Sequence, residues 1–139
     1  MDTYKHKFTN LETKIFSLLC VRSGEKLSQR EIAKILGVSP TAVSKPIKKL
    51  KEKDLLIIEK TKTINFISFN RNNNQSIELK RVENLKNIYL SGLGNYLLHT
   101  LAGGTIILFG SYARGEDIIN SDIDIAVIER KNKILELEK

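Results

Sequence analysis

The sequence predicts an α+β protein built from two units, and three observations support this. Apolar residues first recur at helical spacing and then, after Asp54, change to short apolar runs typical of strands. A polar stretch without periodicity at 71–75 precedes further helices and strands. Residues 1–80 contain 16 lysines and arginines against 8 acidic residues, whereas the rest contains 7 against 8. We therefore place the units at 1–72 and 73–139.

Three helices are expected in the first unit. Thr9 with Glu12, and later Ser28 with Glu31, form the capping-box pattern that begins a helix, and Gly37 ends the second one. Ser39 can cap the third helix, with Pro40 at its first position. Pro46 lies inside this helix and predicts a 3₁₀ or kinked first turn. The apolar face of the third helix comprises Val43, Ile47 and Leu50.

A basic β-hairpin should follow these helices. The apolar runs 55–58 and 64–69 are separated by a polar tip that includes Lys60 and Lys62. The region at about 8–70 resembles the winged helix-turn-helix regulators of bacteria and archaea. The resemblance is carried by the segment LSQREIAKILGVSPTAVSKPIKKLKEKDLL. The resemblance implies that the third helix enters the major groove of double-stranded DNA and that the hairpin tip lies along the phosphates.

The chemistry of the exposed side chains assigns candidate DNA contacts. Hydroxyl groups can donate to phosphates or base edges, an alanine methyl can contact thymine, and lysines neutralise phosphates. The candidates are Ser39, Thr41, Ala42, Ser44, Lys45, Lys48, Lys49, Lys60 and Lys62. The alternative is that this unit mediates only protein contacts.

The second unit is expected to alternate helices and strands. Its first helix should span about 76–91, with Val82, Leu85, Ile88 and Tyr89 on one side, and a second should span about 93–101. Strands are expected at 105–109 and 123–128, followed by a helix at 133–139.

The strongest chemical signal joins the two strands of this unit. Gly110 and Ser111 follow the first strand, where a glycine allows a bulky anion to approach and a serine can bind phosphate oxygens. Asp122 and Asp124 are two residues apart, so both carboxylates should point to one side of the second strand, with Ile123 and Ile125 toward the core. Paired carboxylates are suitable ligands for Mg²⁺.

The spacing Gly-Ser, ten residues, Asp-x-Asp resembles the minimal nucleotidyltransferases of the DNA polymerase β superfamily, in an archaeal type fused to a winged helix. The resemblance implies that Gly110 and Ser111 bind the phosphates of a nucleoside triphosphate such as ATP. Ser111, Asp122 and Asp124 are then the candidate catalytic residues, and Asp122 and Asp124 the Mg²⁺ ligands. Arg114 either contacts phosphate or pairs with Glu116 or Asp117 to shape the loop.

The family's third carboxylate, on a later strand, has no match here, so whether this chain is an enzyme stays open. Glu129, Glu136 and Glu138 are the remaining candidates, and none fits the motif. We therefore expect a C-terminally truncated unit with weak turnover and an exposed sheet edge that favours a homodimer.

The resemblance implies a cytoplasmic transcription regulator that, in full-length form, transfers AMP to a protein partner such as a toxin. Two alternatives remain open: a regulator that senses nucleotides without catalysis, and an enzyme that modifies nucleic acid. No apolar run in the sequence is long enough to span a membrane, so a membrane is not an expected partner.

Overall fold

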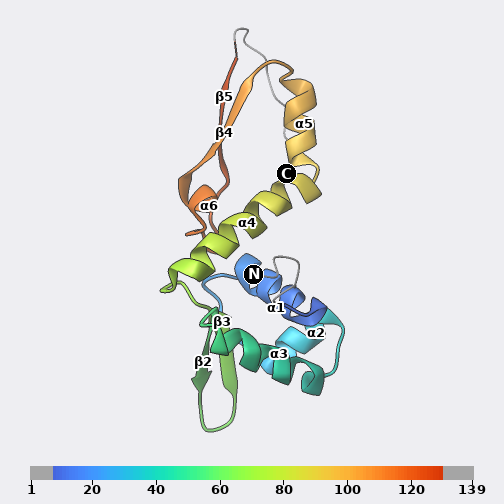
Figure 1. Cartoon of the computed structure of the whole chain (residues 1–139), viewed down its shortest axis with the longest axis vertical. Helices are drawn as coiled ribbons and strands as arrows, with labels where there is room; N and C mark the ends of the chain where they lie inside the picture. Colours follow the sequence, from blue (N-terminus) through green and yellow to red (C-terminus); the bar gives the residue numbers. More distant parts are fainter. Residues whose placement is uncertain (1–7, 130–139) are drawn as a thin grey trace, which may run out of the picture.

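The computed structural model describes residues 8–129 (Figure 1). Three helices and a hairpin form the lower unit in this view, and a long helix, α4 (Asn74–Leu90), leads to a smaller upper unit. The predicted α+β class is confirmed. In the described part of the chain, no helix has the length and apolar character needed to cross a membrane.

The first unit has the predicted order of helices and strands. Thr9 and Glu12 form one capping box and Ser28 and Glu31 the other, while Gly37 ends the second helix in the left-handed conformation with φ 67°. These contacts are local, so the sequence pattern alone specifies them. The elements are α1 (Asn10–Val21), α2 (Gln29–Leu36), α3 (Pro40–Glu52), β2 (Leu56–Lys60) and β3 (Asn65–Phe69).

One contiguous apolar core holds this unit together. It is built from one face of each helix and the inner side of the hairpin, and its fully buried members include Ile15, Leu19, Ile32 and Leu56. The predicted face of α3, namely Val43, Ile47 and Leu50, is buried as expected. Burying each such side chain contributes roughly 1.5–3 kcal/mol relative to leaving it exposed.

One local prediction for this unit is corrected, since the 3₁₀ alternative for the first turn of α3 is wrong, and one short strand was not predicted. No 3₁₀ turn interrupts α3, which runs as an α-helix through Pro46. The burial of apolar residues on either side of Pro46 holds the helix together despite the missing backbone donor. In addition, the two-residue strand β1 (Leu27–Ser28) pairs with β3, placing Leu27 opposite Ile67. Such a short strand carries no periodic signal in the sequence.

The second unit contains a two-stranded antiparallel sheet. It comprises α5 (Leu93–Thr100), β4 (Thr105–Phe109), α6 (Gly110–Arg114) and β5 (Asp124–Ile128), and the register places Phe109 opposite Asp124. Within the described residues neither strand has a further neighbour. The predicted helix at 133–139 lies outside the described residues.

The long helix α4 differs from its prediction in its start and in its buried face. It begins at Asn74, with Asn73 as its cap, so the last two residues of the expected linker, 74 and 75, are helical. Val82, Leu85 and Tyr89 are at least half exposed. The sheet is too narrow to cover this side of the helix, and an open cavity of about 250 Å³ separates Leu85 and Tyr89 from the strands. The residues that α4 does bury are Ser76, Lys80, Asn84 and Ile88.

Direct contacts join the two units. The Ser17 hydroxyl on α1 donates to the Glu83 carboxylate on α4 at 2.8 Å. The backbone N–H of Ile119 donates to the Ser23 carbonyl at 3.0 Å, just beyond the end of α1. The segment between α6 and β5 therefore packs against the first unit.

Candidate functional site

The exposed face of α3 presents hydroxyl and ammonium groups together. Thr41, Ser44, Lys45 and Lys48 follow the spacing i, i+3, i+4, i+7 and therefore share one side of the helix, opposite the buried face. Ser39 lies at the beginning of the helix, where its hydroxyl oxygen accepts the Ala42 N–H at 3.2 Å. Its hydroxyl hydrogen remains available to a phosphate.

Lys49 occupies a different environment from the other predicted lysines. Its ammonium lies 3.5 Å from Glu12 on α1, and Lys53 lies 3.6 Å from the same carboxylate. Burial alone would raise the pKa of the Glu12 carboxyl, but the Thr9 N–H and the charges of Lys53 and Lys49 hold this pKa below its ordinary value. Lys49 thus joins α1 to α3 and is less available for DNA than Lys45 and Lys48.

The hairpin tip is exposed and basic. Lys60 ends β2 and Lys62 lies in the turn, and both are exposed. The Thr61 hydroxyl donates to the Ile64 carbonyl at 2.6 Å and accepts the Ile64 N–H at 3.0 Å, so the turn has a defined shape. The tip can therefore present its two ammonium groups to a phosphate backbone.

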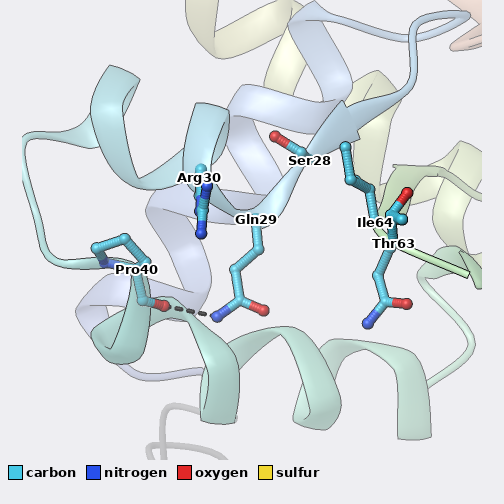
Figure 2. A pocket seen from close by; sticks show the side chains of 7 residues that line it. Ser28, Gln29, Arg30, Pro40, Thr63 and Ile64 are labelled. Atoms are coloured by element: carbon cyan, nitrogen blue, oxygen red, sulfur yellow. Dashed lines mark hydrogen bonds between the residues drawn. The ribbon is translucent and has the colours of Figure 1, made fainter.

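A hollow of about 280 Å³ separates the beginnings of α2 and α3 from the hairpin tip (Figure 2). Gln29 and Arg30 line it on one side, and Thr63, Ile64 and Asn65 on the other. The Gln29 amide donates to the Pro40 carbonyl at 2.6 Å and thereby fixes α2 against α3. The sequence analysis missed Gln29 and Arg30. Both residues lie in the first turn of a capped helix that precedes the third helix, and this position could have indicated them as candidate DNA contacts.

In the second unit, Gly110 and Asp124 meet where β4 passes into α6. Gly110 has φ +76°, and a Cβ atom at this position would lie 2.0 Å from the Asp124 Oδ2. Only glycine therefore fits beside this carboxylate. The structure brings together the glycine and one aspartate of the predicted motif, with Ser111 as the next residue of the chain.

Asp122 and Ile123 differ from their prediction because β5 begins only at Asp124. Asp122 lies in the preceding loop and is exposed, and Ile123 is 44% exposed and not in the core. Strand alternation therefore does not fix the Asp122 side chain. Ser111 is half-buried, and its hydroxyl makes no hydrogen bond within residues 8–129.

Glu116 and Asp117, which follow α6, have different partners: Arg114 at the end of α6 and Lys80 of α4. Arg114 donates to the Glu116 carboxylate at 2.8 Å, and both side chains are at least half exposed, so the pair is weak. Asp117 is buried and pairs with Lys80 of α4. Burial and the Asp117 charge raise the pKa of Tyr112, so its hydroxyl stays protonated and donates to the Asn84 carbonyl at 3.1 Å.

The donor set around Gly110 fits Mg²⁺ only in part. Asp124 and Asp122 supply hard carboxylate oxygens, and Mg²⁺ commonly takes one or two protein carboxylates together with substrate phosphates and water. Among the described residues, no group of three or more acidic, histidine or cysteine side chains is placed to hold a metal. Glu129 lies just beyond β5, and Glu136 and Glu138 lie outside the described residues.

Comparison with known protein families gives two matches to separate parts of the chain. Residues 15–63 match the model of the MarR family, and residues 95–139 match that of the nucleotidyltransferase domain. The first match covers most of α1, all of α2 and α3, and β2 with the turn after it, but not β3. The second includes Gly110, Ser111, Asp122 and Asp124. The chain thus combines a MarR-type segment with a nucleotidyltransferase-type segment. A comparison with curated proteins found no match.

Solved structures resemble this chain at low sequence identity. The adhesin competence repressor (AdcR) from Streptococcus pyogenes matches with a TM-score of 0.52 and 22% identity, covering 73% of this chain and 72% of its own. A point mutant of ZitR from Lactococcus lactis matches with a TM-score of 0.50 and 20% identity, covering 72% of this chain and 64% of its own. These similarities confirm the winged-helix fold.

Proposed function

We propose that this protein is a DNA-binding transcription regulator whose second unit binds a nucleoside triphosphate together with Mg²⁺. The observation that carries the nucleotide assignment is the Asp124 carboxylate placed directly beside Gly110, the residue that Ser111 follows in the chain. The exposed hydroxyl and ammonium groups of α3 and the basic hairpin tip support DNA binding. The MarR and nucleotidyltransferase matches agree with both halves of the proposal.

On DNA, α3 enters the major groove and the hairpin tip follows the adjacent backbone. Lys45, Lys48, Lys60 and Lys62 neutralise phosphates, while Thr41, Ala42 and Ser44 contact base edges or phosphates. Lys49 contributes less because it is paired with Glu12. The hollow beside Gln29 and Arg30 lies between these two elements and can accept a segment of the sugar-phosphate backbone.

In the nucleotide site, Ser111 binds the terminal phosphates, Gly110 leaves space for them, and Asp122 and Asp124 hold Mg²⁺. The metal, when bound, supplies charge that polarises the α-phosphate and stabilises pyrophosphate as it leaves. Arg114 reaches phosphate only after releasing Glu116, a small cost for an exposed ion pair.

We propose that this unit transfers AMP to a protein acceptor such as a toxin, and that binding of the first unit to DNA regulates expression. A nucleotide sensor without turnover is the second candidate. The observation favouring it is that no third acidic side chain joins Asp122 and Asp124 among the described residues.

Incubation with Mg²⁺, cell extract and ATP labelled at its α-phosphate separates these functions. Label transferred to a protein supports AMP transfer to a protein acceptor, and nucleotide binding without transfer supports the sensor. Label on nucleic acid instead indicates an enzyme that modifies nucleic acid. If ATP does not bind with Mg²⁺ under any of these conditions, the nucleotide assignment is wrong.

A further inference from the structure

The buried side of α4 is polar where a helix in this position would ordinarily be apolar. Ser76, Lys80 and Asn84 are spaced four residues apart and are each at most 4% exposed. Burying polar groups costs free energy unless each finds a partner, and replacement by apolar residues is often neutral or stabilising. The polar side of α4 is therefore explained better by the geometry it imposes than by stability.

The partners of Lys80 and Asn84 both lie in the segment after Ser111. Lys80 is fully buried and its ammonium donates to the Asp117 carboxylate. The Asn84 side-chain amide donates to the same carboxylate oxygen at 2.7 Å and to the Tyr112 carbonyl at 2.8 Å. Two residues of α4 thus fix this segment at two separate points.

These two points bracket the turn between α6 and the loop that leads to Asp122. Tyr112 follows Ser111 directly, and Asp117 precedes Asp122 by five residues. Between them, Gly115 approaches α4 so closely that a Cβ atom would lie 2.5 Å from the Ile77 carbonyl oxygen. The conformation of the segment that joins Ser111 to Asp122 is therefore set by α4.

Lys80 and Asn84 contact the loop before Asp122 from the side that faces α4. A cavity of about 250 Å³ is lined by Asn84, Asp117, Ser121 and Ile123, whereas Asp122 does not line it. The loop therefore turns one side toward α4 and exposes the Asp122 side chain on another side. In the described residues the side chains of Lys80 and Asn84 bond only to Asp117 and to the Tyr112 carbonyl, so we assign them no direct contact with the nucleotide.

We propose that Lys80 and Asn84 are positioning residues for the nucleotide site: by holding Asp117 and the Tyr112 carbonyl, they set the distance between Ser111 and the two aspartates. This inference rests on the proposed binding of nucleotide with Mg²⁺. The occupant of the site is a nucleoside triphosphate bound through its phosphates, and the probe is ATP with Mg²⁺.

The test compares Asn84→Asp with Asn87→Asp in the full chain. Both changes replace an amide by a carboxylate on the same helix, but only Asn84 donates to the loop, and Asn87 makes no side-chain hydrogen bond in the described part of the chain. We expect Asn84→Asp to weaken Mg²⁺-dependent ATP binding about tenfold or more, because small displacements of binding groups have large effects. Asn87→Asp should bind within about twofold of the unchanged protein, a difference of less than about 0.5 kcal/mol.

DNA affinity, measured at a temperature where each variant is fully folded, separates positioning from general damage. A positioning role leaves DNA affinity unchanged while ATP affinity falls. Should Asn84→Asp fail to fold, Asn84→Ala removes both donors without adding a charge and takes its place.

Each other outcome overturns a defined statement. Equal ATP binding by both variants, or a parallel loss of ATP and DNA binding, overturns the positioning role alone. Failure of the unchanged protein to bind ATP with Mg²⁺ overturns the proposed nucleotide site and the positioning role with it.

Discussion

Gly110 is required both by its backbone conformation and by its contact with a carboxylate of the candidate site. Its positive φ and the adjacent Asp124 carboxylate both exclude a side chain. Gly110→Ala should therefore strain the backbone by about 1–2 kcal/mol and displace Asp124. We expect ATP binding with Mg²⁺ to fall about tenfold, a change of about 1.4 kcal/mol, while DNA binding is retained. Titration calorimetry measures the first effect and a DNA gel shift the second.

The matched control for Gly110→Ala is Gly37→Ala. Gly37 also has a positive φ, but a Cβ atom there would have no neighbour within 4 Å. Gly37→Ala therefore introduces the same kind of backbone strain but no clash with a carboxylate. Equal losses of ATP affinity in both variants would contradict the role assigned to Gly110.

Glu12 makes the stability of the first unit depend on pH. Its carboxyl has a pKa below the ordinary value of 4.5, so its contribution is present above the unfolded pKa and is lost as pH falls through the folded one. Glu12→Gln should lower the free energy of unfolding at neutral pH by about 1–2 kcal/mol, because a cap and two ion pairs are weakened. The variant should also lose less stability than the unchanged protein between neutral pH and pH below 4.5. Denaturant unfolding at several pH values measures both effects, and parallel pH profiles would contradict the assignment.

At the scale of elements, α3 carries the electrostatic part of DNA binding. Each phosphate that a lysine neutralises steepens the dependence of log affinity on log salt by about 0.9. Lys45→Ala and Lys48→Ala should each reduce this slope by about that amount. Lys49→Ala should reduce it less, since Lys49 already pairs with Glu12. Affinity measured across a salt series decides this, and equal slopes for all three variants would contradict the proposed face.

The elements that the sequence predicted well are those defined by nearby residues. Both capping boxes and the left-handed Gly37 depend on contacts within a few positions, and the hairpin pairs residues only 5 to 13 positions apart. The strand β1 and the polar side of α4 depend on residues about 40 positions away, such as Ile67 for Leu27 and Asp117 for Lys80. No local pattern encodes such pairings, so the periodicity of α4 did not show which of its sides is buried.

The same distinction applies to the candidate site. Motif spacing predicted that Gly110 and Asp124 would meet, and the register of β4 with β5 explains the contact. The position of Asp122 could not be predicted, because the start of β5 depends on how far its pairing with β4 extends. The pairing of Lys49 with Glu12 was likewise hidden, since it depends on the packing of α1 against α3.

At the scale of the whole molecule, the contacts between units predict that the units unfold together. The Ser17 hydroxyl of α1 donates to the Glu83 carboxylate of α4, and Ile118 lies so close to Gly24 that a Cβ atom added to Gly24 would be 3.2 Å from the Ile118 side chain. Three of the four tyrosines lie in the second unit, and the chain has no tryptophan, so near-UV circular dichroism reports mainly on that unit. Thermal transitions followed in the near and far UV should coincide. Two separated midpoints would contradict coupling between the units.

The central claim is that Asp124 and the Gly110-Ser111 turn form a site for a nucleotide with Mg²⁺. Calorimetric titration of ATP, with and without Mg²⁺, into the unchanged protein, Asp124→Asn and Asp54→Asn tests it most directly. We expect Mg²⁺-dependent binding that Asp124→Asn abolishes. Asp54→Asn, the same chemical change in the first unit between α3 and β2, should leave this binding intact. Binding that is indifferent to Mg²⁺, or that survives in Asp124→Asn, would contradict the claim.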